Sequence, residues 1–101
     1  NDTTAGWYKA APEPERDYVR RYLRVDGKDV AWDFVRASYA SASRLAVVTL
    51  PDLFSLGSAA RFNTPSKAEG NWQWRYRAAA LEKFFGDTTN YLRELATLYG
   101  R

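Results

Sequence analysis

The run Leu45-Ala46-Val47-Val48-Thr49-Leu50 gives the clearest indication of fold class in this chain. The run is apolar, rich in β-branched residues and without alternation, which is typical of a parallel strand buried on both faces. One such strand cannot satisfy its own backbone N–H and C=O groups, and the sequence offers no second convincing strand. We therefore predict an α/β fold with one core parallel strand at about 45–50. Its partner strands would lie outside these 101 residues or in a partner chain.

The segments on both sides of this strand predict helices. Before it, prolines and acids at 12–15 open one helix that ends at Asp26-Gly27, and a second helix starts at Asp29. After it, we expect a short helical turn at 51–57, a loop at 57–74, a helix at 77–85 and a last helix capped by Asp87. Residues 1–11 read as a loop, in which Asp2, Thr3 and Thr4 can cap a short turn.

Composition excludes several kinds of chemistry. The chain has 101 residues, enough for one domain at most, and contains neither histidine nor cysteine. A zinc site, a Ser-His-Asp triad and a disulfide framework are therefore not expected, and only carboxylates, Tyr and Lys remain for acid–base chemistry. We expect no metal and no cofactor.

Charge and hydropathy limit the partners and the location. The net charge is +3, but acids and bases alternate, which favours a solvated surface and does not favour nucleic acid. The longest apolar run is far shorter than the roughly 20 residues of a membrane span, so no membrane is expected. The lack of cysteine fits the cytoplasm. Because the first residue is Asn, we also expect that the chain was excised from something longer.

Three stretches carry a family resemblance through their order and spacing. They are Asn-Asp-Thr-Thr-Ala-Gly-Trp at 1–7, Asp-Leu-Phe-Ser-Leu-Gly-Ser-Ala-Ala-Arg-Phe-Asn-Thr-Pro at 52–65 and Gly-Asn-Trp-Gln-Trp-Arg at 70–75. Together they resemble the C-terminal part of the glycoside hydrolase family 77 4-α-glucanotransferases, which include amylomaltase and the plastid disproportionating enzyme. Residues 95–101 are similar to the family's end. The chain departs from the family at Pro51, Ala59 and Phe62, where Gln, an acid and Met are usual.

The resemblance implies a (β/α)8 TIM barrel that transfers α-1,4-glucan segments to the 4-hydroxyl of an acceptor glucan. The retaining mechanism needs two carboxylates and a covalent glycosyl-enzyme. Residues 1–101 would be a single segment of that barrel: the loop after the seventh strand, the eighth strand and the closing helices. The family's catalytic carboxylates precede the residue that matches Asn1, so the resemblance implies no catalytic residue in this chain and no activity of the chain alone.

Three residues are candidates for substrate binding. Asn63 matches a family Asn that hydrogen-bonds glucan, and the alternative is a turn-forming Asn before Thr64-Pro65. Arg61 either reaches a sugar or another loop, or makes an intramolecular salt bridge, which we favour. Trp72, together with Trp74, either forms a platform on which glucose rings stack or packs in the core.

Three further residues are expected beside the catalytic centre. The resemblance places Asn1 and Asp2 there without a catalytic role, and for Asp2 we favour the alternative of a loop or helix cap. Asp52 lies near the end of the predicted strand and either supports the site or caps the following turn. The expected partners are α-1,4-glucans and the remainder of the barrel.

Two other classes of function compete with this interpretation. One is a basic nucleic-acid-binding domain that uses the arginines of the first long helix, Arg16, Arg20, Arg21 and Arg24. The other is a stand-alone carbohydrate-binding module that uses the two tryptophans, although such modules are usually all-β.

Overall fold

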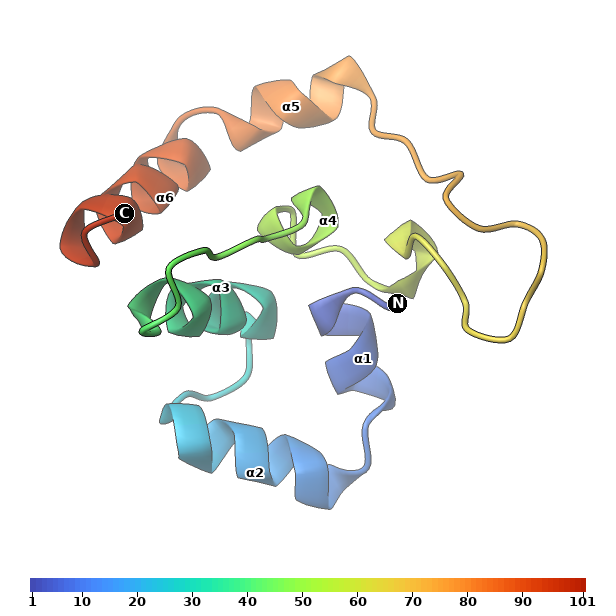
Figure 1. Ribbon diagram of the computed structural model, residues 1–101, viewed down its shortest axis with the longest axis horizontal. Helices are drawn as coiled ribbons and strands as arrows, with labels where there is room; N and C mark the ends of the chain where they lie inside the picture. Colours follow the sequence, from blue (N-terminus) through green and yellow to red (C-terminus); the bar gives the residue numbers. More distant parts are fainter.

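Helices account for all the regular secondary structure of the computed structural model, which describes residues 1–101 (Figure 1). In chain order they are α1 (Thr4–Ala10), α2 (Glu13–Leu23), α3 (Val30–Ala40), α4 (Leu50–Leu53), the 3-10 helix η1 (Ser58–Ala60), α5 (Ala78–Phe84) and α6 (Asp87–Leu98). Four of the predicted helices therefore form close to their expected bounds, as α2, α3, α5 and α6.

Helix α3 is the centre of packing. Its residues Val30, Ala31 and Val35 are buried on one face, as the helical spacing of apolar residues requires. Helices α1, α4 and α6 all contact α3. Two aromatic pairs reinforce these contacts, since Trp7 of α1 meets Phe34 at a centroid distance of 6.0 Å, and Trp32 meets Tyr91 of α6 at 5.3 Å.

The N-terminal segment differs from the predicted loop. Residues Thr4–Ala10 form helix α1, and Thr3 is its N-cap, with Thr3 Oγ1 accepting a hydrogen bond from the Gly6 N–H at 3.1 Å. Thr3 is buried, so the cap satisfies a backbone donor that water cannot reach. The expectation that residues 1–11 form a loop is therefore wrong, whereas the predicted capping by this segment is confirmed.

The caps of two other helices also differ from expectation. Helix α2 ends earlier than Gly27, because Arg24 takes the left-handed conformation with φ 57°. Helix α6 starts at Asp87, but Gly86 is the N-cap and no side chain caps the helix. The predicted cap at Asp87 is therefore wrong, although Gly86, at φ 95°, does separate α5 from α6.

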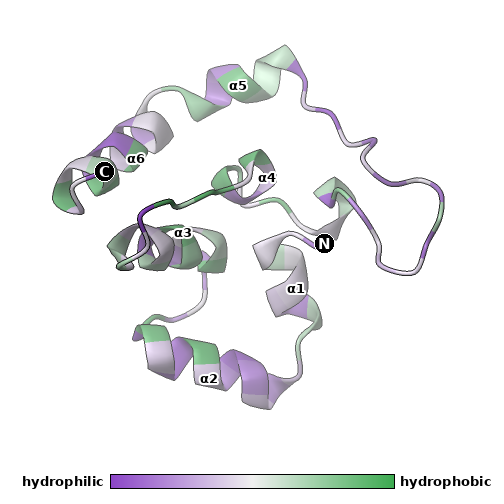
Figure 2. Ribbon diagram, in the orientation of Figure 1, coloured by the Kyte–Doolittle hydropathy of each residue, from purple (hydrophilic) through white to green (hydrophobic).

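The predicted strand at 45–50 is wrong for this structure. Residues 45–49 have no regular structure, and no backbone hydrogen bond joins residues 45–48 to the rest of the chain. Leu45 and Val47 are exposed, and Leu50 already belongs to α4. Figure 2 shows this apolar connection between α3 and α4. The physical reason is that a strand is defined by its ladder partners, and this chain supplies none.

The molecule is more open than a self-contained domain of its size. Only nine of the 101 residues are buried, and the accessible surface is 7408 Å², whereas a folded monomer of this mass is expected to expose about 5,800 Å². The radius of gyration is 14.5 Å, compared with about 13 Å expected for a compact domain of this length. None of the helices combines the length and the apolar composition that a bilayer crossing requires.

Candidate functional site

Five of the six residues singled out in the sequence line one small hollow. The hollow has a volume of about 180 Å³ and lies where the N-terminal segment, the start of α4 and the loop after η1 meet. Its walls include Asn1, Asp2, Arg61, Asn63 and Trp72. The fully buried Pro51, one of the departures from the family pattern, also lines it. The fold thus brings together three segments that are far apart in the sequence.

Asp2 and Arg61 join two of these segments. The Asp2 carboxylate accepts hydrogen bonds from the Thr3 N–H at 2.8 Å and from the Ser58 hydroxyl at 2.9 Å. Arg61 Nη1 lies 3.6 Å from Asp2 Oδ2, which confirms that Arg61 forms an intramolecular ion pair. Asp2 therefore serves as a structural acceptor between the N-terminal segment and the loop that contains η1.

Asn63 is held by its backbone and not by its side chain. Its carbonyl oxygen accepts from Arg61 Nε at 3.0 Å and from the backbone nitrogen of Asn1 at 3.1 Å. Its side-chain amide makes no hydrogen bond within the chain, although the residue is only partly exposed. An amide that is fixed at its backbone and unoccupied at its side chain can offer both a donor and an acceptor to a ligand.

Asp52, the sixth residue, lies next to the hollow and supports its wall. Asp52 Oδ1 accepts from the Thr4 N–H at 2.8 Å, and Oδ2 accepts from the Thr49 hydroxyl at 2.9 Å. The N-cap residue of α4 is Thr49, and the Asp52 carboxylate accepts from its hydroxyl, so Asp52 takes part in capping the following turn without being the N-cap itself. Asp52 satisfies a free donor in the first turn of α1, across 48 residues of sequence.

Gly6 and Thr49 contribute to the site and were not singled out from the sequence. A Cβ atom on Gly6 would lie 2.3 Å from Ser58 Oγ, 2.5 Å from Asp2 Oδ1 and 2.8 Å from the Ser58 backbone nitrogen. Glycine is thus required for α1 to approach η1. A sequence signal did exist for Thr49, because Thr49-Leu50-Pro51-Asp52 has the spacing of a helix-capping box.

The aromatic side chains form a layer beside the hollow. Trp72 is 66% exposed and stacks on Phe62, with ring centroids 5.9 Å apart and planes 10° apart. Trp74 meets the same Phe62 ring edge-on at 5.9 Å. The prediction that Trp72 packs in the core is therefore wrong. Trp74, for which core packing was also predicted, is half-buried. Trp72 also has φ 61°, a left-handed conformation that a bulky residue rarely adopts and that often marks a functional site.

A larger hollow lies elsewhere and contains none of the six residues. It has a volume of about 650 Å³ and is mainly apolar, with Trp32, Leu53, Phe54 and Phe84 among its lining residues. A polar hollow next to it contains Asp33, whose pKa is raised by burial while the nearby Arg36 lowers it. The larger hollow does include parts of two of the family stretches, at 53–56 and 74–75, but neither hollow contains any of the six residues singled out in the sequence. We therefore place the functional site at the smaller hollow, which contains five of them.

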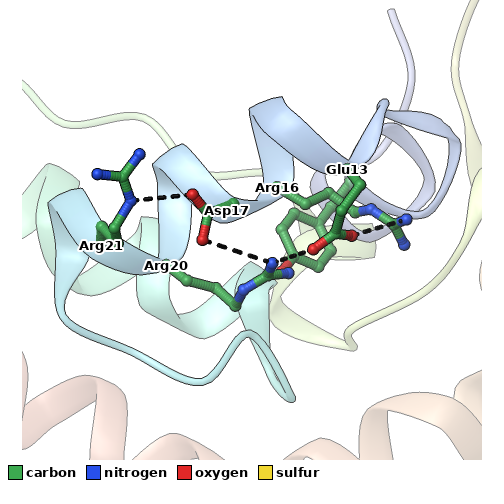
Figure 3. A network of polar contacts seen from close by, with 6 residues as sticks. Glu13, Arg16, Asp17, Arg20 and Arg21 are labelled. Atoms are coloured by element: carbon green, nitrogen blue, oxygen red, sulfur yellow. Dashed lines mark hydrogen bonds and ion pairs between the residues drawn. The ribbon is translucent and has the colours of Figure 1, made fainter.

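The arginines of α2 do not form a free phosphate-binding stripe. Glu13 pairs with both Arg16 and Arg20, and Asp17 pairs with Arg21 at 2.9 Å (Figure 3). The Arg20 guanidinium donates hydrogen bonds to Tyr8 and to Glu13. These bonds, with that to Tyr8 having the larger effect, raise the pKa of Arg20 above its ordinary value. Because the acids of the same helix engage three of the four arginines proposed for phosphate binding, all but Arg24, the structure does not favour the nucleic-acid interpretation.

Comparison with known proteins gives one consistent result. Residues 1–81 match the family model described as 4-alpha-glucanotransferase. The chain is 34% identical to the chloroplastic/amyloplastic 4-alpha-glucanotransferase of Arabidopsis thaliana, over all of this chain and 18% of that protein. It is 41% identical to the 4-alpha-glucanotransferase of Thermus thermophilus, over 85% of this chain and 18% of that protein.

A solved structure agrees with these relatives. The amylomaltase of Streptococcus agalactiae in complex with acarbose superposes on the whole chain with a TM-score of 0.88 and 26% identity, and the match covers 20% of that protein. The chain therefore spans about a fifth of the length of the proteins that it matches. With the family model matched over most of its residues, the chain belongs to the 4-alpha-glucanotransferase family.

Proposed function

We propose that this chain is part of a longer 4-α-glucanotransferase, here called the parent protein, and supplies a wall of its glucan-binding site. The catalytic carboxylates would come from the rest of the parent protein. The observation that carries the proposal is the meeting of Asn1, Asp2, Arg61, Asn63 and Trp72 around one hollow. The bound acarbose in the similar amylomaltase supports a sugar as the ligand.

The hollow offers the two kinds of contact that a glucan needs. The free side-chain amide of Asn63 can donate to one sugar hydroxyl and accept from another. The exposed face of Trp72, held by its stack on Phe62, provides an aromatic surface beside it. Asn1, Asp2 and Asp52 lie next to these groups and hold the segments in place.

The acids of the site do not suit the transfer chemistry. A retaining transfer needs one carboxylate as nucleophile and another as acid and base, about 5–5.5 Å apart. The oxygens of Asp2 and Asp52 are already occupied by backbone and hydroxyl donors that hold the fold together. We therefore propose that neither is catalytic, that the parent protein supplies the double-displacement carboxylates, and that the chain alone is inactive.

The open shape of the chain supports its place within a larger barrel. The unpaired apolar segment 45–49 would form the eighth barrel strand once neighbouring strands supply its backbone hydrogen bonds. Residues 1–101 then comprise the loop after the seventh strand, that strand and the closing helices. The large exposed surface would be covered by the remaining parts of the parent protein. We keep the cytoplasm as the expected location, although the plant relatives are chloroplastic.

Replacing Asn63 with alanine in the parent protein is expected to lower kcat/KM for glucan transfer by about 5- to 150-fold, because two hydrogen bonds to the sugar, each about 0.5–1.5 kcal/mol, are lost. The measurement is glucose release from maltotriose. Asn90→Ala on α6 is the matched control, since Asn90 is exposed and lies outside the hollow. Unchanged kcat/KM for Asn63→Ala would remove this residue from the glucan site.

A further inference from the structure

Arg61 connects the proposed glucan-binding Asn63 to the N-terminal segment. Its Nε atom donates to the Asn63 carbonyl oxygen at 3.0 Å, and its Nη1 atom lies 3.6 Å from Asp2 Oδ2. Asp2 is itself fixed by donors from Thr3 and Ser58. Since a guanidinium has only donors and holds them in one rigid plane, these contacts determine where the plane lies.

The same contacts determine what Arg61 leaves free. The carbonyl of Asn63 accepts from two donors, so its backbone is fixed, while its side-chain amide has no partner within the chain. The Arg61 side chain is only 31% exposed, and its Nε and one Nη atom face protein acceptors. Other groups at the hollow, namely Arg61 Nη2, the Asn1 side-chain amide and the Trp72 indole N–H, also have no partner within the chain. Among them, the Asn63 amide belongs to the residue whose backbone Arg61 holds, and it offers both a donor and an acceptor.

We propose that Arg61 is a positioning residue that aims the Asn63 side chain at the glucan and does not itself bind the sugar. This inference rests on the proposed function. Arg61 acts by holding the Asn63 carbonyl at a fixed distance from Asp2, so the amide meets the sugar without first having to be ordered. Ordering the group beforehand reduces the entropy that binding would otherwise cost.

Lysine would not reproduce this arrangement. An ammonium group is a single point charge on a flexible stem, and it lacks the Nε donor that reaches the Asn63 carbonyl. Arg61→Lys keeps the attraction to Asp2 but loses the geometry. Arg61→Lys therefore shows whether Arg61 acts through its positive charge alone or through the orientation that it gives to Asn63.

The test is a double-mutant cycle in the parent protein, with kcat/KM for glucose release from maltotriose as the readout. We expect Arg61→Ala and Arg61→Lys each to lower kcat/KM about tenfold when Asn63 is present, and less than about twofold when Asn63 is alanine. The exposed Arg21→Ala variant on α2 is the control and is expected to match the unsubstituted protein. Thermal unfolding of each variant accompanies the assay, and the lysine variant carries the cycle if the alanine variant does not fold.

Two results would overturn the proposal. An equal loss from the Arg61 substitution with and without Asn63 would show that Arg61 acts independently, as a direct sugar ligand would. Full activity of Arg61→Lys would show that positive charge alone is enough. Failure of the proposed function appears separately, as an inactive parent protein or an Asn63→Ala variant of unchanged kcat/KM, before any Arg61 variant is considered.

Discussion

Gly6→Ala is expected to destabilise the folded chain by about 2–3 kcal/mol, although alanine in a helix normally adds about 0.5–1 kcal/mol of stability. Gly6 lies inside α1, and a Cβ atom there would overlap Ser58 Oγ, Asp2 Oδ1 and the Ser58 backbone nitrogen. One of these neighbours is backbone, so rotation of a side chain cannot relieve the overlap, and α1 must separate from η1. The measurement is the urea midpoint of the chain, followed by far-UV circular dichroism.

The control for this substitution is Gly57→Ala. Gly57 has an ordinary extended backbone, and a Cβ atom there would meet nothing within 4 Å. Its replacement is expected to leave stability unchanged within about 0.5 kcal/mol, or to raise it slightly by restricting the unfolded chain. If Gly6→Ala raised the urea midpoint as helix propensity alone predicts, the close approach of α1 and η1 would be contradicted. In the parent protein, separation of these elements is also expected to lower transfer activity, because Asp2 and Ser58 belong to the contact.

Leu95→Ala is expected to cost about 2–5 kcal/mol, the range for deletion of a fully buried leucine. Leu95 is 2% exposed and lies on α6, which packs against α3. With only nine buried residues in the chain, few others can compensate for this loss. We therefore expect α6 to detach from α3, with a large fall in the urea midpoint.

The neighbouring Leu98 gives a matched control for that substitution. It belongs to the same helix but is 67% exposed, so Leu98→Ala is expected to change stability by less than about 0.5 kcal/mol. Separation of α6 from α3 would also part Trp32 from Tyr91, which lie 5.3 Å apart, and would change the tryptophan fluorescence. Equal effects of the two leucine substitutions would show that α6 does not pack on α3 as described.

The helices were predictable because their signals are local. Prolines and acids at 12–15, the apolar spacing of α3 and the glycine at 86 act within a few residues, and α2, α3, α5 and α6 formed near the expected places, whereas α1 was expected as a loop. The segment at 45–50 was not predictable in the same way. Its composition favours a strand, but a strand exists only when a partner chain segment accepts and donates its hydrogen bonds.

At the site, too, features encoded by neighbouring residues were predictable from the sequence, whereas contacts between distant residues were not. The family resemblance pointed to Arg61, Asn63 and Trp72, and the fold does bring them to one hollow. The contacts that hold the hollow together were not visible in the sequence, because Asp52 reaches the first turn of α1 across 48 residues. Pairs at such separations leave no periodic pattern and become evident only once the helices are packed.

The catalytic role assigned to the rest of the parent protein is tested by comparing glucose release from maltotriose by the parent protein and by the 101-residue chain alone, at equal molar concentration. We expect turnover by the parent protein and none by the chain, since Asp2 in the hollow and Asp52 beside it are occupied as structural acceptors. Turnover by the chain alone would contradict this assignment, because a pair of catalytic carboxylates would then have to lie within these residues.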